Sequence, residues 1–163
     1  MVPIEDADER DLPGILAILN DVIATSTAVF SDDPVTLAEQ REWLRARRER
    51  GFPVLVVREG DEVLAYASYG DFRPHPGYRT TVEHTVHVAA SARRRGIGRE
   101  LLTRLIELAR EDGMHVMVAG VDAANEPSIA LHEQLGFVES ARMTEIAQKF
   151  GCWVDLVLLT RVL

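Results

Sequence analysis

Residues 86–111, VHVAASARRRGIGRELLTRLIELARE, constrain the fold of this chain more than any other stretch. Val86, His87 and Val88 form a strand-like run, and a basic turn that contains Gly96 and Gly98 follows it. An amphipathic helix comes next, because apolar residues recur there at helical spacing: Leu101, Leu102, Leu105, Ile106 and Leu108. A strand, a glycine turn and a helix start are together typical of a phosphate-binding site.

The chemistry of this turn favours an anion. The first amides of a helix have no partner within the helix and lie at the positive end of its dipole, so an anion placed there receives several hydrogen bonds. Gly96 and Gly98 let a ligand approach the backbone, because they carry no Cβ atom. The turn is basic within an acidic chain, owing to Arg93, Arg94, Arg95 and Arg99. An ordinary tight turn with solvated arginines is the alternative, and the turn alone does not decide between them.

The glycine spacing distinguishes among known phosphate loops. A dinucleotide fingerprint requires three glycines and a P-loop requires Gly-Lys-Ser/Thr, and neither is present. Arg93-x-x-Gly96-x-Gly98 instead resembles the pyrophosphate loop of the GCN5-related N-acetyltransferases, the GNAT family. A second motif resembles the same family in the correct order: Asn125-x-x-Ser128-x-x-Leu131-His132-Glu133-x-x-Gly136-Phe137. Two ordered motifs are more specific than either one.

The GNAT resemblance implies acetyl-CoA as a co-substrate. It implies that the strand backbone at Val86 and Val88 pairs with the pantetheine arm like an added strand, and that Asn125 binds other polar groups of the ligand. The residues implied to bind acetyl-CoA are Val86, His87, Val88, Arg93, Arg94, Arg95, Gly96, Ile97, Gly98, Arg99, Asn125 and Ser128.

Composition narrows the class of protein. With 163 residues, 47% of them hydrophobic and 27% charged, the chain is expected to form one globular domain over residues 1–163. Its net charge of −8 disfavours nucleic acid or an anionic membrane as the main partner. The acidic N-terminus does not resemble a signal peptide, and no apolar run is long enough to span a membrane. Cys152 is the only cysteine, which excludes an internal disulfide and fits the cytoplasm.

Periodicity and capping signals predict eleven elements around one sheet. Strands are expected at residues 2–5, 53–58, 63–69, 81–88, 116–121, 137–143 and 153–163. Helices are expected from a cap at Asp8 or Asp11 to about Thr25, from a capping box at Thr36 and Glu39 to about Arg50, from about Gly98 to Glu111, and from Asn125 to Leu135. This order predicts an α/β (α+β) chain with the GNAT fold, a mixed sheet of about seven strands flanked by about four helices.

One branch of the family resembles nearly the whole chain, namely the phosphinothricin and methionine sulfoximine acetyltransferases. The matching residues are Ser26 and Thr27 with Phe30, residues 66–79, residues 81–86, and residues 148–151 with Trp153 and Asp155. Near the end, this chain has Phe150, Cys152 and Val154 where the herbicide-detoxifying members have a histidine-rich His-Gly-Gly-Trp-His-Asp sequence. The departure favours methionine sulfoximine or methionine sulfone as substrate and disfavours efficient turnover of phosphinothricin.

Acetyl transfer to an amine requires a base for the amine and an acid for the departing thiolate. The branch resemblance places the catalytic glutamate at Glu83, three residues before Val86, whereas a glutamate paired on an exposed sheet face is the alternative. His132 stands where many family members have a tyrosine that protonates the thiolate; a surface histidine on a helix is the alternative. His84 and His87 should point to opposite faces of their strand, so no metal site is expected.

An amino-acid substrate needs a cation for its carboxylate. Arg73 lies in the loop at 71–78, which is rich in proline and aromatic residues, and Arg79 directly follows this loop. Arg73 is preferred because its context matches the branch; a solvated loop arginine is the alternative for each. Phe30, Tyr78 and Phe150 are expected to line the side-chain pocket, and Trp153 a dimer interface, since related enzymes are dimers. The predicted substrate residues are Phe30, Arg73, Pro74, His75, Tyr78, Arg79, Glu83, His84, Thr85 and Phe150.

These observations predict a cytoplasmic, homodimeric N-acetyltransferase that transfers acetyl directly from acetyl-CoA to the α-amine of a small methionine-like amino acid. Cys152 has no activating context in the sequence, so no covalent intermediate is expected. The alternatives are an enzyme that acetylates protein N-termini or lysines, and a CoA-binding module without catalytic activity.

Overall fold

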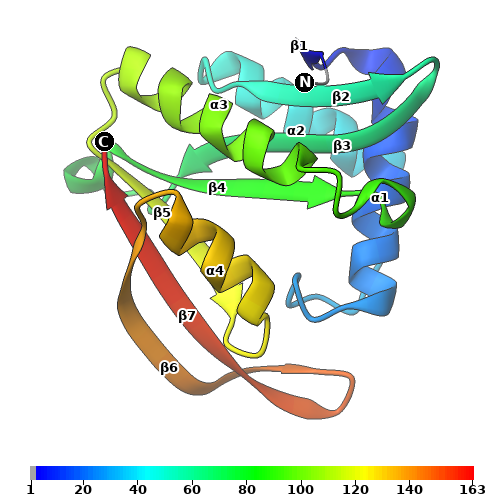
Figure 1. The fold of residues 1–163 in the computed structure, drawn as a ribbon. Coiled ribbons are helices and arrows are strands. Elements are labelled where there is room, and N and C mark those ends of the chain that lie inside the picture. Colours follow the sequence, from blue (N-terminus) through cyan, green and yellow to red (C-terminus); the bar gives the residue numbers. More distant parts are fainter. Residues whose placement is uncertain (1–2) are drawn as a thin grey trace.

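The computed structural model describes residues 3–163 as one seven-stranded sheet with two helices on each face (Figure 1). The helices are α1 (Leu12–Thr25), α2 (Leu37–Glu49), α3 (Ile97–Glu111) and α4 (Glu126–Gln134). The strands are β1 (Ile4–Asp6), β2 (Val54–Glu59), β3 (Glu62–Asp71), β4 (Thr81–Val88), β5 (Val116–Asp122), β6 (Val138–Lys149) and β7 (Cys152–Val162). The predicted mixed α/β (α+β) arrangement of about seven strands and four helices is therefore confirmed.

The sheet has a single break in its pairing pattern. The strand order is β1-β2-β3-β4-β5-β7-β6, and β4 with β5 is the only parallel pair among these strands. These two strands pair only from Thr81–Glu83 with Val116–Val118, after which β5 continues alongside β7 alone. The second half of β4 is therefore paired through β3 on one side and has no strand on its other side.

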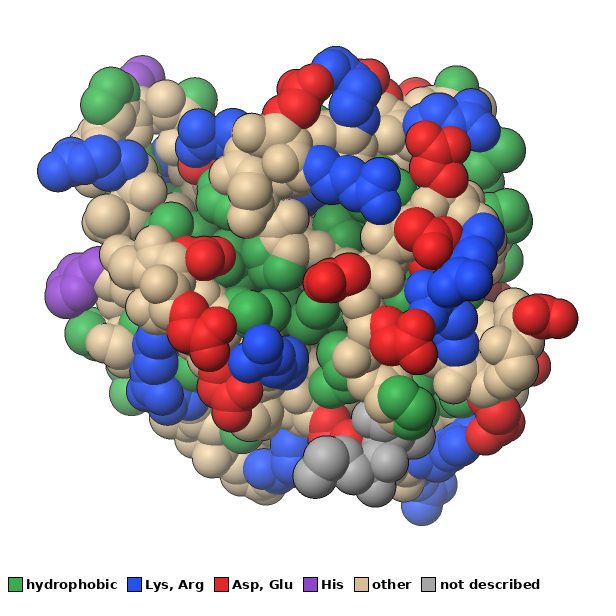
Figure 2. All heavy atoms as spheres, turned by 90° about the horizontal axis from the view of Figure 1, so that it is seen from above, with side chains coloured by type: hydrophobic (Ala, Val, Ile, Leu, Met, Phe, Trp, Pro, Cys, Tyr) green, Lys and Arg blue, Asp and Glu red, His purple; other side chains and the backbone are tan. Residues whose placement is uncertain are grey.

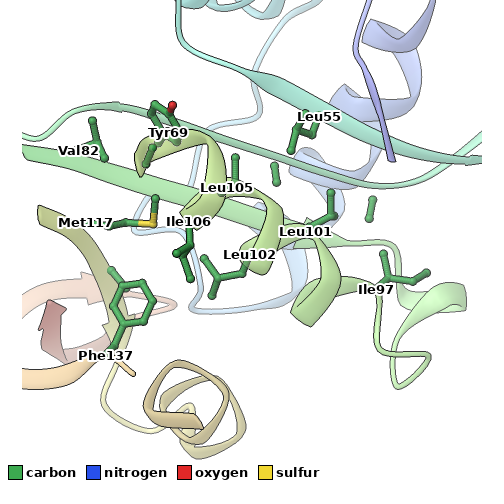
Figure 3. Packing of buried hydrophobic residues seen from close by; sticks show 14 of the residues in the cluster. Leu55, Tyr69, Val82, Ile97, Leu101, Leu102, Leu105, Ile106, Met117 and Phe137 are labelled. Atoms are coloured by element: carbon green, nitrogen blue, oxygen red, sulfur yellow. The ribbon is translucent and has the colours of Figure 1, made fainter. Parts of the chain in front are cut away.

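Two apolar clusters hold helices to the two faces of the sheet. On one face, α3 packs with the residues that its amphipathic pattern predicted, including Leu101, Leu102 and Leu105, which are almost completely buried (Figure 3). On the other face, Leu12, Ile15 and Leu44 of α1 and α2 pack against β2 and β3. On each face, apolar side chains are buried between the helices and the sheet, and this burial is the main contribution to the stability of such a fold.

The capping signals at the start of α2 were correct. The Thr36 hydroxyl accepts a hydrogen bond from the Glu39 amide, and the Glu39 carboxylate accepts one from the Thr36 amide. The end of the strand predicted at 137–143 was wrong, because β6 continues to Lys149. A bulge between Met143 and Ala147, with Glu145 at a φ of +51°, interrupts the alternation that marks a strand. Residue 2 of the first predicted strand lies outside the described residues.

Charged side chains of both signs cover the upper edge of the molecule. Figure 2 shows basic side chains, which are arginines because the only lysine is buried, interspersed with Asp and Glu on this face, without a continuous basic surface. Among residues 3–163, none of the helices combines the length and apolarity that crossing a membrane requires.

A buried amine joins the tip of the β6–β7 hairpin to the loop after α1. Lys149 is the only lysine of the chain, and its side chain is 1% exposed. Its ammonium group donates hydrogen bonds to the carbonyl oxygens of Ile23 (2.7 Å), Val29 (3.0 Å) and Ser31. Three carbonyls thereby replace the water that a buried cation loses, and they fix the loop that carries Phe30.

Replacing this amine should destabilise the fold. Lys149→Met keeps the aliphatic stem but leaves three carbonyls without their donor, so we expect the free energy of unfolding in urea to fall by about 3 kcal/mol. Arg142→Met, an exposed site on the same strand, is the matched control and should change it by less than about 0.5 kcal/mol. Equal stabilities of the Lys149→Met and Arg142→Met proteins would contradict the role of the amine.

Candidate active site

A cleft of about 450 Å³ opens where β4 and β5 separate. Side chains from both faces of the sheet meet there, because no strand fills the gap. The lining residues are Ala28, Val29, Arg47, Gly70, Asp71, Glu83, His84, Thr85, Val86, His87, Val88, Gly98, Leu102, Gly120, Val121, Asp122, Asn125, Ser128, Leu131 and His132. This volume lies in the range of small-molecule sites. The cleft thus brings together predicted residues from β4, the start of α3 and α4.

Glu83 lies in the cleft between two glycines of the neighbouring strands. Gly70 of β3 is its cross-strand partner, and a Cβ atom on Gly120 of β5 would lie 3.2 Å from the Glu83 Oε1 atom. The absence of a side chain at Gly120 leaves room beside the carboxylate for a ligand, whereas the space over Gly70 is taken by the guanidinium of Arg47. Burial raises the pKa of Glu83, and the charge of Arg73 opposes this by lowering it. A carboxylate with a raised pKa is suited to accept a proton near neutral pH.

The start of α3 has free amides facing the end of β4. Gly96 precedes the helix with a φ of +83°, which favours glycine, and no side chain caps the helix. A Cβ atom on Gly98 would meet only the Val88 Cγ2 atom, at 3.6 Å, so the helix start lies directly beside the free edge of β4. The backbone of β4 and the amides of α3 therefore present donors and acceptors to the same elongated space.

Three of the four arginines near this turn have partners in the protein. Arg95 forms an ion pair with Glu59 (3.1 Å), Arg99 contacts the Gln134 side chain, and Arg93 donates to the Val88 carbonyl (3.4 Å). Arg94 has a φ of +64°, an unusual conformation for a residue with a side chain, so the turn is held in a specific shape. The uncapped helix amides, rather than all four guanidinium groups, are therefore the main donors that the predicted phosphate site offers.

On the other side of the cleft, α4 begins at Asn125, which the sequence predicted as a ligand residue. Its side-chain oxygen accepts a hydrogen bond from the Ser128 amide (3.2 Å) and so caps the helix. The nearby Asp122 was not predicted; its carboxylate accepts hydrogen bonds from Thr27 and from the Ala124 amide. The side-chain NH2 group of Asn125 makes no hydrogen bond within residues 3–163 and is available to a ligand.

A chain of hydrogen bonds links β4 and α4 through two stacked histidines. The His132 Nδ1 atom lies 2.7 Å from the Ser128 carbonyl oxygen, and the His132 and His84 Nε2 atoms are 3.0 Å apart. Since a carbonyl only accepts, His132 carries its proton on Nδ1 and its Nε2 accepts from His84. His84 Nδ1 is then a buried acceptor without a partner in residues 3–163. In neutral form, His132 therefore has no proton on the Nε2 side.

Burial keeps these imidazoles neutral. It lowers the pKa of His84 to about 3, aided by His132 and His87, and it lowers the pKa of His132 against the effect of the Ser128 carbonyl. His87 points to the opposite face, as strand alternation predicts, and packs on Tyr66; burial lowers its pKa to about 4, with a contribution from Arg93. Residues 3–163 contain no group of three or more His, Cys, Asp or Glu side chains arranged to bind a metal ion.

Several predicted substrate residues lie outside the cleft lining. Pro74, His75, Tyr78 and Arg79 belong to an exposed loop that contains a short 3-10 helix, Pro76–Tyr78. Arg73 stacks on Phe72, 4.2 Å from its ring centroid, at the rim of the cleft where its charge reaches Glu83.

Two predicted aromatic walls are also outside this lining. Phe30 is 37% exposed and Phe150 is 55% exposed, and Phe150 lies at the β6–β7 turn over the Lys149 amine. These assignments therefore stay predictions.

Comparison with known proteins adds to this geometry. A sequence model of the Acetyltransferase (GNAT) family matches residues 15–137. The chain is 50% identical over 157 residues, 96% of its length and 91% of the relative, to an L-methionine sulfoximine/L-methionine sulfone acetyltransferase of Pseudomonas paraeruginosa.

Two solved structures share the fold over nearly the whole chain. A ribosomal-protein-alanine N-acetyltransferase from Brucella melitensis matches with a TM-score of 0.97 and 46% identity, covering 99% of this chain and 100% of that one. A GNAT superfamily phosphinothricin acetyltransferase from Sinorhizobium meliloti, in complex with acetyl-CoA, matches with a TM-score of 0.96 and 31% identity, covering 99% and 88%.

The buried histidines predict a loss of stability in acid. A histidine whose pKa is lower in the folded than in the unfolded state leaves the free energy of unfolding at its full value above pH 6.5, where it is neutral in both states. As the pH falls below the unfolded pKa, the unfolded state binds the proton more strongly and the free energy of unfolding decreases. With a folded pKa of about 3, His84 should account for about 2 kcal/mol of lost unfolding free energy between pH 6.5 and pH 5. Urea denaturation at both pH values should show this loss reduced in His84→Gln but not in the exposed control His115→Gln. An NMR titration of His84 near pH 6.5 would contradict it.

Proposed function

Because the chain belongs to the GNAT family of acetyltransferases, we propose that it transfers the acetyl group of acetyl-CoA to the α-amine of a small methionine-like amino acid. L-Methionine sulfoximine and L-methionine sulfone are the proposed substrates. The single observation that carries the proposal is Glu83, a carboxylate of raised pKa placed between Gly70 and Gly120 in a cleft that also receives the helix start of a CoA-binding motif. Half of the residues are identical to those of a relative with this named activity.

The residues around the cleft fit acetyl-CoA. The uncapped amides at Gly96–Gly98 suit its diphosphate. The free edge of β4 at Val86 and Val88 suits the amides of its pantetheine arm, and Asn125 offers the NH2 group of its side chain as a further donor. Bound in this way, acetyl-CoA would supply the thioester carbonyl that the substrate amine attacks, in the cleft that Glu83 also lines.

The protein then has three tasks. Glu83 removes a proton from the substrate ammonium, directly or through water, which frees the nitrogen lone pair to form the new C–N bond. The backbone of β4 orients the acyl group, and as the C–S bond breaks, the departing thiolate gains a proton. Transfer is direct within a ternary complex. The exposed Cys152 at the start of β7 is not in the cleft lining, which supports a route without an acyl-cysteine.

We propose His132 as the general acid that protonates the departing thiolate, because it lines the cleft from α4. Its resting proton is on Nδ1 and bonds to Ser128, so His132 donates to the thiolate only after it has accepted a second proton at Nε2. Since burial lowers the pKa of His132, its doubly protonated form is rare at neutral pH.

Arg73 is proposed to bind the substrate carboxylate from the rim, with Phe30 and Phe150 beside the substrate side chain. The residues at 150–154 favour the sulfoximine and sulfone over phosphinothricin. Exposed apolar residues of β6 and β7, including Ile146 and Trp153, support a homodimer through this hairpin. The unpaired thiol of Cys152 supports a cytoplasmic location, where acetylation of a toxic methionine analogue confers resistance.

Thiol release from acetyl-CoA tests the proposed reaction. The purified protein is assayed with methionine sulfoximine, methionine sulfone, phosphinothricin, and a peptide with an N-terminal alanine. Turnover of the first two supports the proposal. Turnover of the peptide alone would favour the alternative activity named for the Brucella structure, and binding of acetyl-CoA without turnover of any amine would make the protein a binding module.

Replacing the proposed base should remove the acid limb of the pH profile. In the wild type, kcat/KM should rise with pH through the raised pKa of Glu83, because only the carboxylate accepts a proton. Glu83→Gln should lose about 10²-fold or more in kcat, with unchanged calorimetric affinity for acetyl-CoA. A Glu83→Gln protein with the wild-type rate and pH profile would exclude Glu83 as the base.

A further inference from the structure

Arg47, near the end of α2, is a cation in the cleft wall without a counter-ion of its own. Its side chain makes no hydrogen bond and no ion pair within residues 3–163, and its Nε atom is buried without a partner. Asp71, the acid whose charge acts on Arg47, already accepts two hydrogen bonds from Arg50, at 2.8 and 3.2 Å. Burial lowers the pKa of Arg47, and the charge of Asp71 opposes this only in part. A half-buried guanidinium whose Nε atom has no partner is costly unless something in the cleft compensates it.

Gly70 brings this guanidinium next to the proposed base. A Cβ atom on Gly70 would lie 2.1 Å from the Arg47 Nη1 atom, so the guanidinium occupies the space of the missing side chain. Gly70 is directly opposite Glu83 in the sheet, where paired Cβ atoms are about 5 Å apart. Because Gly70 and Glu83 are paired on neighbouring strands, Arg47 and Glu83 line the cleft from the same face of the sheet. One α-amino acid lying on this face offers a carboxylate to the guanidinium and an ammonium to the Glu83 carboxylate.

Packing alone accounts for only part of this arrangement. The Arg47 guanidinium carbon lies 5.7 Å from the Trp43 ring centroid, a cation–π contact that stabilises one face of the group. This contact uses none of the five N–H donors of the guanidinium. The donors that line the cleft are matched by a carboxylate, whose two oxygens accept two parallel hydrogen bonds from the planar fork.

We propose that Arg47 binds the α-carboxylate of the acceptor amino acid from the wall of the cleft while Glu83 receives its α-amine. The inference rests on the proposed acetyltransferase function and adds to it a specificity residue from α2. Arg73 is exposed at the rim and contributes charge there, whereas Arg47 is half-buried in the wall of the cleft. A free amino acid satisfies both groups, but a peptide N-terminus carries no carboxylate at this position, so Arg47 selects free amino acids over peptides.

The test compares two substrates in two arginine variants. Methionine sulfone and its carboxamide are assayed with the wild type, with Arg47→Met, and with Arg45→Met as the matched control from the exposed side of the same helix. Arg47→Met should lower kcat/KM for the free amino acid by about ten- to hundredfold, the effect of losing hydrogen bonds to a charged group. It should change kcat/KM for the carboxamide less than threefold and leave the KM for acetyl-CoA unchanged. Arg45→Met should change none of these values.

The result that overturns the inference is specific to it. If the folded Arg47→Met protein loses activity equally on both substrates, or on neither, Arg47 does not bind the carboxylate. Arg47→Lys provides a second variant should Arg47→Met not fold: it keeps the charge but not the planar fork, and it should still reduce turnover of the amino acid more than that of the carboxamide. A wild type that releases no thiol with any amine would instead refute the proposed function itself.

Discussion

The incomplete pairing of β4 with β5 is the constraint on which the rest of the site depends. Three parallel register positions hold the two strands together, and beyond them β5 stays with β7 while β4 stays with β3. The gap exposes backbone groups of β4 that a continuous sheet would have satisfied, and such groups are costly when buried without a partner. A ligand that lies along β4 restores this pairing, which explains why the helix start of α3 and the cap of α4 both face the same gap.

Small residues make this gap usable. At Gly120 a side chain would occupy the space beside Glu83, and at Gly98 it would approach Val88 at the start of α3. These two glycines leave room along the path of one extended ligand, and Gly70 leaves the space that the Arg47 guanidinium fills. The buried amine of Lys149 acts from outside the path: it fixes the carbonyls at Val29 and Ser31, and Val29 belongs to the wall of the cleft.

The sequence was sufficient where local chemistry determines structure. The capping box at Thr36, the glycine turn before α3 and the apolar face of α3 depend on residues within a few positions of one another, and each was predicted correctly. Arg47 could not be found in this way, because α2 carries several arginines and periodicity marks them all as solvated. Gly70, which is distant in the sequence, leaves the space that the Arg47 guanidinium fills. The bulged part of β6 was missed for a related reason, since its pairing with β7 overrides a sequence that does not alternate.

Burial acts on the pKa values of Glu83 and Arg47, which both line the cleft, in opposite directions. It raises the pKa of Glu83 and lowers the pKa of Arg47, so each group is pushed toward its neutral form by the loss of water. The neighbouring histidines, held neutral by the same burial, offer no charge to either. A zwitterionic amino acid supplies an ammonium to the carboxylate and a carboxylate to the guanidinium in one molecule. Its binding offsets both desolvation costs together, whereas a neutral amide or a plain amine offsets only one, and this asymmetry is the physical basis for selecting a free amino acid.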